Sequence, residues 1–307
     1  MIPGVLSFVA FLALRQEDAL DRARLLAESG RLAEAVSFLE SRNRAEARAP
    51  ELAYLAELHS AAGALPQAAS ALQRALELAP GEDGLRVTLG AMLYELRKYE
   101  EAKAELELAI ARRPADARAH YYLAAVYRGL LRLDLAERAA RRAIELSPPP
   151  ARAPLDSVEP LPAVAARHLL AEIRFELGED VEPVLREVLA VEPQHASARY
   201  LLAQSHRRSG RAAEAAEELV RFDRTKRADS HLVQGLGLAR LGRSEAALVE
   251  LRLALEANPD DPRALFLLAR ELLRAGRRED AAPLLARLLA LRPDAASEVD
   301  RLFGSFP

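Results

Sequence analysis

The chain has 307 residues, of which 50% are hydrophobic and 29% charged, with a mean hydropathy of −0.08. This composition excludes a wholly disordered chain, and the 5% of aromatic residues, with no Trp, disfavours β-sandwiches and barrels. A net charge of −3 lacks the positive excess that binds phosphates, so we expect no nucleic-acid partner. The absence of cysteine removes disulfides, thiolate metal ligands and thiol nucleophiles.

The chain begins with an apolar leader at residues 1–15. Its residues 5–14 form a largely apolar run of ten residues, too short for a bilayer span of about 20 residues, so we expect no integral membrane span. A secretory signal has this length, but no basic residue precedes the run and no clear cleavage site follows it. An export signal and a capping helix on the first repeat both stay open, and with them an exported or periplasmic location and a cytoplasmic one.

A period of 34 residues governs most of the remaining chain. In the first half it relates Pro80, Pro114 and Pro148, then Ala68, Ala102 and Ala136, then Ala75, Ala109 and Ala143, and finally Leu55, Leu89 and Leu123. In the second half it relates Pro259 to Pro293, Ala247 to Ala281, Leu251 to Leu285 and Gly242 to Gly276. Identical residues recur at this spacing at so many positions that the sequence indicates an array of structural repeats.

Each repeat reads as two amphipathic helices. Apolar residues between 65 and 76 recur at spacings of three and four, which places them on one helical face. Glycines that can end the first helix in a left-handed conformation recur between the two helices, and the periodic prolines stop the second helix. These glycines are Gly30, Gly63, Gly210, Gly242 and Gly276.

The pattern resembles the tetratricopeptide repeat family, whose unit carries Leu-Gly and Tyr in the first helix, Ala and Phe in the second, and a closing Pro. The third unit has Leu89, Gly90, Tyr99, Ala102, Leu106, Ala109 and Pro114, and the fourth has Leu123, Ala124, Tyr127, Ala136, Ala143 and Pro148. Eight units begin near Gln16, Ala49, Asp83, Ala117, Val164, Ala196, Ala228 and Pro262. Leu52, Arg86 or His120 replaces the family's first-helix Trp. The resemblance implies an all-α, right-handed superhelical α-solenoid of helix-turn-helix repeats.

We therefore place units one to four at residues 16–150 and units five to eight at 164–295. Between them, residues 151–163 form a proline-rich linker, since six prolines between 147 and 162 exclude a helix there. This linker is either an insertion between half-arrays or a segment that covers the groove or binds another domain. Residues 296–307 are expected to form a C-terminal capping helix with Val299, Leu302 and Phe303 facing inward.

The sequence contains no constellation that predicts catalysis. Gly235, Gly237 and Gly242 lack the spacing and the preceding strand of a nucleotide loop. His168 and Glu172 are four residues apart on one helical face and could share a metal, but the pattern offers no further ligand. We therefore predict a protein that is not an enzyme and has no cofactor or metal site.

In the family that the chain resembles, first helices line a concave surface that binds peptides or partner helices. Projection of that property predicts a groove containing Tyr54, Tyr94, Arg118, Tyr121, Arg128, Tyr200, Gln204, Arg207, Arg240, Arg263, Phe266, Arg270 and Arg274, together with Glu57, His168 and Glu172. Tyr and Arg concentrate binding energy at interfaces, although each tyrosine could equally pack between helices.

The arginines of the last units favour an acidic peptide as partner. The sequence thus predicts a non-catalytic protein-interaction scaffold. The alternatives are a regulatory or targeting subunit of a separately encoded enzyme and a self-assembling structural module. The Ala- and Arg-rich composition is typical of a GC-rich bacterial genome.

Overall fold

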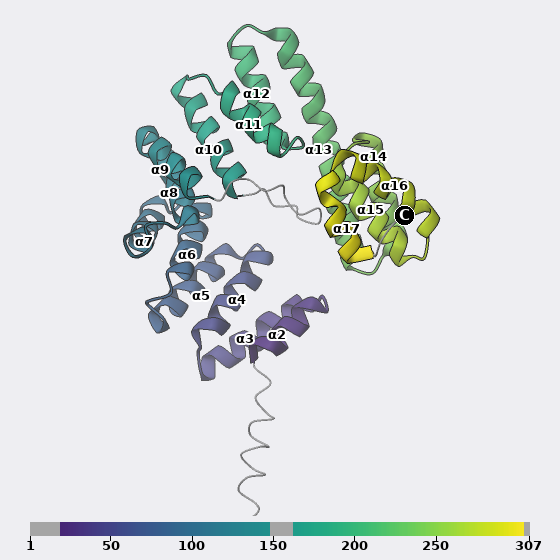
Figure 1. Cartoon of the computed structure of the whole chain (residues 1–307). Helices are drawn as coiled ribbons and strands as arrows, with labels where there is room; N and C mark the ends of the chain where they lie inside the picture. The colour runs from purple at the N-terminus through teal and green to yellow at the C-terminus, as the bar shows by residue number, and fades with distance from the viewer. Residues whose placement is uncertain (1–18, 148–161, 304–307) are drawn as a thin grey trace, which may run out of the picture. The chain divides into compact units, whose positions relative to one another are not determined.

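The computed structural model describes residues 19–147 and 162–303, which form α-helices joined by short turns, with one 3₁₀ turn (Figure 1). The predicted leader at 1–15 and nearly all of the predicted linker at 151–163 lie outside the described residues. The chain divides into two compact units, Met1–Leu146 and Ser147–Pro307. Within the described residues, the prediction of an all-α array of helix-turn-helix repeats is confirmed.

The first unit is a series of antiparallel helix pairs in which each helix packs on the next along the chain. Its helices are α2 (Ala19–Glu28), α3 (Leu32–Ala45), α4 (Ala49–Ala61), α5 (Leu65–Leu78), α6 (Asp83–Glu95), α7 (Tyr99–Arg112), α8 (Ala117–Gly129) and α9 (Leu133–Leu146). The periodic prolines Pro80 and Pro114 stand two residues after the last residues of α5 and α7, where they cannot continue the helix.

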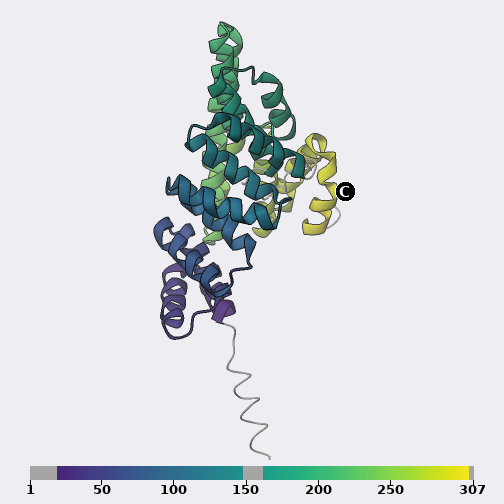
Figure 2. The same cartoon turned by 90° about the vertical axis from the view of Figure 1, so that its left-hand side faces the viewer.

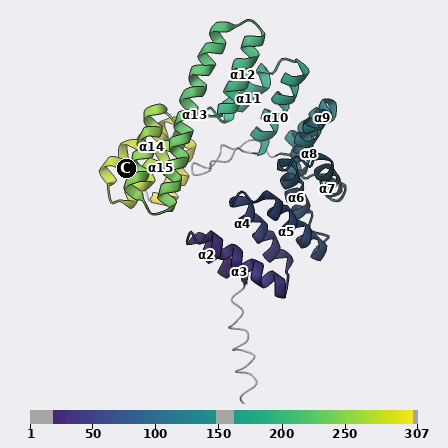
Figure 3. The ribbon, with the colours of Figure 1, turned by 180° about the vertical axis from the view of Figure 1, so that it is seen from behind.

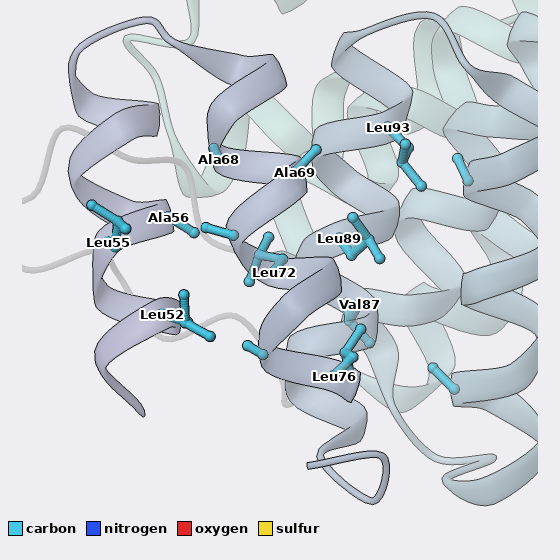
Figure 4. Close-up of a cluster of buried hydrophobic side chains, with 14 of the residues drawn as sticks. Leu52, Leu55, Ala56, Ala68, Ala69, Leu72, Leu76, Val87, Leu89 and Leu93 are labelled. Atoms are coloured by element: carbon cyan, nitrogen blue, oxygen red, sulfur yellow. The ribbon is translucent and has the colours of Figure 1, made fainter. Parts of the chain in front are cut away.

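Small and branched apolar side chains form the core of this unit. Leu52 and Leu55 of α4, Leu72 of α5 and Leu89 of α6 are buried in one continuous cluster (Figure 4). Gly90 permits the close approach of α6 and α7, because a Cβ at this position would lie 2.6 Å from Leu106 Cγ. The spacing of apolar residues in the sequence therefore corresponds to faces that bury against neighbouring helices.

The turn inside each pair depends on a left-handed residue. After α4, Gly63 has φ +74°, its N–H donates to the Ser60 carbonyl, and the next N–H, of Ala64, donates to the His59 carbonyl. This pairing satisfies carbonyls at the helix end. In the third and fourth repeats Arg97 (φ 58°) and Leu131 (φ 59°) adopt the same conformation without glycine.

The second unit consists of α10 (Pro162–Leu177), α11 (Glu182–Val191), α12 (Ala196–Arg208), α13 (Ala212–Arg240), α14 (Ser244–Ala257), α15 (Pro262–Arg274), α16 (Arg278–Leu291), the 3₁₀ turn η1 (Pro293–Ala295) and α17 (Ala296–Phe303). The second helix of the fifth repeat, α11, has 10 residues, while α5, α7 and α9 have 14 each. Val299 of α17 is buried against the last repeat, and the side chains of Leu302 and Phe303 lie outside the described part.

The turn that the sequence predicts between the sixth and seventh repeats, near Ala228, is replaced by the continuous 29-residue helix α13. The first half of α13 packs on α12 and its second half packs on α14 (Figures 1 and 3; Figure 2 shows the same ribbon from the side). Thr225 permits this continuity. In other repeats a proline stands six residues before a fixed position of the next first helix, as Pro80 stands before Arg86 and Pro193 before Arg199. Thr225 stands six residues before His231, at the position of that proline, and threonine can continue a helix.

Candidate functional site

An open cleft lies on the second unit between α10, α12 and the first half of α13. Its volume is about 610 Å³. The lining residues are His168 and Glu172 of α10, Ser197, Tyr200 and Leu201 of α12, and Phe222 and Lys226 of α13. The cleft therefore joins an apolar wall to side chains of both charges.

Two aromatic rings dominate the apolar wall. Tyr200 and Phe222 pack with ring centroids 5.3 Å apart, and the Lys226 ammonium lies 5.8 Å from the Phe222 centroid. Tyr200 remains 46% exposed, whereas the residues at the same repeat position in α6 and in the second half of α13, Val87 and Leu232, are buried. Tyr200 is exposed because α13 continues straight and its second half does not fold back against α12.

His168 lies at the polar end of the cleft, and His195 packs behind it. The His168 ring stacks on His195, with centroids 4.7 Å apart. His195 caps α12, since its Nδ1 accepts the N–H of Ala198 at 3.2 Å. Burial and the neighbouring His168 lower the pKa of His195 from 6.5 to about 4, against the opposing effect of a backbone hydrogen bond. The ring is therefore neutral at pH 7, which its role as a hydrogen-bond acceptor requires.

The structure places the predicted groove residues of the first unit on first helices, but in several environments. Tyr54 is half-buried with the Arg24 guanidinium 5.8 Å from its ring centroid, and Tyr94 packs on Tyr99 at 6.0 Å. Tyr121 packs edge-on against Tyr122 at 5.1 Å, Arg118 is exposed and Arg128 is half-buried. These contacts are consistent with helix packing as well as with ligand contact.

On the second unit, Tyr200 lines the cleft, Gln204 is half-buried and Arg207 is exposed, all on α12. Arg240 ends α13, and its side chain lies outside the described part of the structure. Phe266, by contrast, does not lie on an exposed face. Its side chain is 0% exposed and belongs to the core of the last repeats, where α15 is covered on several sides.

The arginines of α15 are neutralised by carboxylates of the chain itself. Arg263 pairs with Asp229 at 2.5 Å and with Asp261 at 3.3 Å. Arg270 and Arg274 share the buried Glu271, at 3.2 and 2.9 Å. The like charges that suggested an acidic partner therefore have internal counter-ions.

Phe222 and Lys226 are cleft residues that the sequence interpretation missed. They lie in a second helix, and the groove was projected from first helices alone. Two signals together could have indicated an exposed face here: Thr225, which permits α13 to continue, and the sixth repeat, which is two residues shorter than the period.

Other features of the described residues are less specific. A smaller cavity of about 370 Å³ between α4, α5 and α6 is lined largely by apolar side chains such as Ala56, Leu72 and Met92. Within residues 19–147 and 162–303, no third His, Asp or Glu joins a pair to form a candidate metal site. In the same ranges, every helix is too short or too polar to cross a bilayer.

Sequence comparison settles the family. Tetratricopeptide repeat patterns match residues 59–126 and 238–302, and a second pattern of the same description matches 182–225, together more than half of the chain. The chain belongs to the tetratricopeptide repeat family. Among curated proteins, no significant match was found.

Solved structures share the tetratricopeptide repeat fold. A tetratricopeptide repeat protein from Parabacteroides merdae aligns with a TM-score of 0.55 and 17% identity over 83% of this chain and 98% of its own. MamA from Desulfovibrio magneticus aligns with a TM-score of 0.49 and 20% identity, over 58% and 97%. YrrB, described as having an unusual peptide-binding site, aligns with a TM-score of 0.38 and 16% identity, over 74% and 94%.

Proposed function

We propose that this protein is a non-catalytic scaffold that binds a segment of a protein partner in the cleft between α10, α12 and α13. The exposed Tyr200–Phe222 pair is the observation that carries the proposal. A large ring that remains 46% exposed, at a position that the third and seventh repeats bury, offers apolar area at little cost in side-chain entropy. Tetratricopeptide repeats build such surfaces by stacking helix pairs.

The polar groups around this pair favour a protein segment over a purely apolar ligand. Glu172 and His168 lie on α10, and Lys226 lies on α13. Groups of both signs can orient a polar backbone or charged side chains, while the rings supply contact area. The internal ion pairs of Arg263, Arg270 and Arg274 remove the need for a strongly acidic partner.

A displayed peptide library tests this proposal. Peptides selected on the full-length protein should lose at least about tenfold in affinity for a Tyr200→Ala/Phe222→Ala variant, because truncation of two central aromatic side chains removes more than about 1.4 kcal/mol. Leu108→Ala is the matched control, since Leu108 is also an exposed apolar side chain, on α7 of the first unit. Selected peptides that bind the double variant as tightly as the wild type would contradict the proposal.

A further inference from the structure

The continuous helix α13 leaves one face of the sixth repeat uncovered. In the second repeat, Ala69 and Leu76 of α5 are buried in the cluster that includes Val87 and Leu89 of the next first helix, α6 (Figure 4). The residues at the same repeat positions in the sixth repeat are Ala216 and Asp223, and both are exposed. The sixth repeat therefore lacks the helix that would normally follow it on this side.

The second half of α13 carries the complementary uncovered face. In the fourth repeat, Ala119 and Val126 of α8 are fully buried, and α8 packs on α7 and α6 of the preceding repeat. The same positions in the seventh repeat are Ser230 and Gly237, and both are exposed. Val233, between them, is 57% exposed. Small residues at these positions permit the close approach that stacked repeats require.

These two faces cannot meet within one molecule while α13 is continuous. In the regular array, Gly129 at the end of α8 contacts the ring of Tyr99 at the start of α7, since a Cβ on Gly129 would lie 2.7 Å from that ring. The corresponding residues of the sixth and seventh repeats are Ala212 and Arg240, the two ends of α13. At 1.5 Å per residue these ends are about 42 Å apart.

We propose that a second copy of this chain covers both faces, with the two α13 helices packed antiparallel. The first half of one α13 then contacts the second half of the other, and two equivalent repeat interfaces form about a two-fold axis near the middle of the helices. The contact has the register of the interface between regular neighbouring repeats, with Ala216 and Asp223 of one copy facing Ser230 and Gly237 of the other. The inference rests on the proposed function, since it names the protein segment that covers the face beside Tyr200.

Chemical cross-linking tests the contact directly, because the chain has no cysteine of its own. In the Ala216→Cys/Gly237→Cys variant, the two thiols of one α13 are about 31 Å apart. A short bifunctional thiol reagent should therefore link two copies and yield a covalent dimer, while either single variant yields far less. A link within one chain would instead mean that α13 breaks and folds back, and would overturn the proposal. Absence of any link would overturn it as well.

Light scattering of the purified protein over a range of concentrations provides the second readout. The wild type should be a dimer, and Val233→Glu should weaken the dimer by at least about tenfold, because the contact would bury an unpaired carboxylate. Val249→Glu is the matched control on α14, where Val249 is 54% exposed. A monomeric wild type, or equal dimerisation of both variants, would overturn the second copy while leaving the peptide selection of the proposed function untouched.

Discussion

Arg86 and Glu105 form an ion pair of 2.9 Å between the first and second helices of the third repeat. The same guanidinium donates to the Pro80 carbonyl of the preceding turn at 3.0 Å. The arrangement recurs as Arg199 with Glu218 at 3.1 Å and as His231 with Glu250 at 2.8 Å. An Arg–Glu or His–Glu pair thus occupies the position where the family usually places a tryptophan, and it links the two helices of a repeat to each other.

Loss of Glu105 should therefore destabilise the first unit. Glu105→Gln removes the counter-ion of a largely buried guanidinium, and we expect the free energy of unfolding to fall by about 1–2 kcal/mol. Glu101→Gln on the same helix is the control, because the Lys98–Glu101 pair is exposed and worth less than about 0.5 kcal/mol. Denaturant unfolding measures both variants, and equal effects would show that the Arg86 pair contributes no more than a surface contact.

The two left-handed residues without glycine predict a stabilising change. Leu131 has φ 59° and is exposed, so Leu131→Gly should relieve backbone strain and raise the unfolding free energy by about 0.5 kcal/mol after the entropy of the unfolded glycine is included. Gly63→Ala, at φ +74°, should lower it by about 1 kcal/mol. Gly81→Ala, in open space without a positive φ, controls for the substitution itself. A destabilised Leu131→Gly would contradict this account of the turn.

Close helix approach predicts opposite effects for two glycines of α6. Gly90→Ala should destabilise by about 1–3 kcal/mol, because its Cβ would lie 2.6 Å from Leu106 Cγ. Gly84→Ala meets nothing within 4 Å and should be neutral or stabilising by a few tenths of a kcal/mol. Thermal unfolding of both variants checks the prediction, and similar melting temperatures would mean that α6 and α7 are farther apart than described.

His195 predicts a pH dependence of stability. Its pKa is about 4 in the folded chain and 6.5 in the reference state, so between these values the unfolded chain binds the extra proton. Stability should therefore decrease as pH falls from 6.5 towards 4, by at most about 3 kcal/mol. Unfolding measured across this range should give a flatter profile for His195→Asn, which retains a capping acceptor for Ala198 N–H but does not titrate. Superimposable profiles would contradict the assignment.

Much of the fold follows from the sequence because its causes are local. The 34-residue columns, the glycines at the hairpin turns and the prolines after second helices predicted the helix pairs. The continuous α13 was also present in the sequence, in Thr225 at the proline column and in a sixth repeat two residues shorter than the period. The regular spacing of the flanking residues nevertheless predicted a turn near Ala228.

The candidate site was less predictable because it depends on contacts between distant segments. A helical projection placed Phe266 on the same face as Tyr200, but only the three-dimensional packing determines that one is buried and the other exposed. The counter-ion of Arg263 includes Asp229, 34 residues away on α13, which no projection of α15 contains. Helix faces could be predicted, whereas the elements that cover them could not.

The continuity of α13 through residues 225–229, which leaves a repeat interface uncovered, underlies both proposals. Spin labels on the Ala216→Cys/Gly237→Cys variant measure it most directly, with the labelled protein diluted into unlabelled copies so that distances within one chain dominate. A continuous helix predicts a backbone separation of about 31 Å. A separation of about 10 Å, that of two packed helices, would mean that α13 folds back into a regular array and would contradict the account.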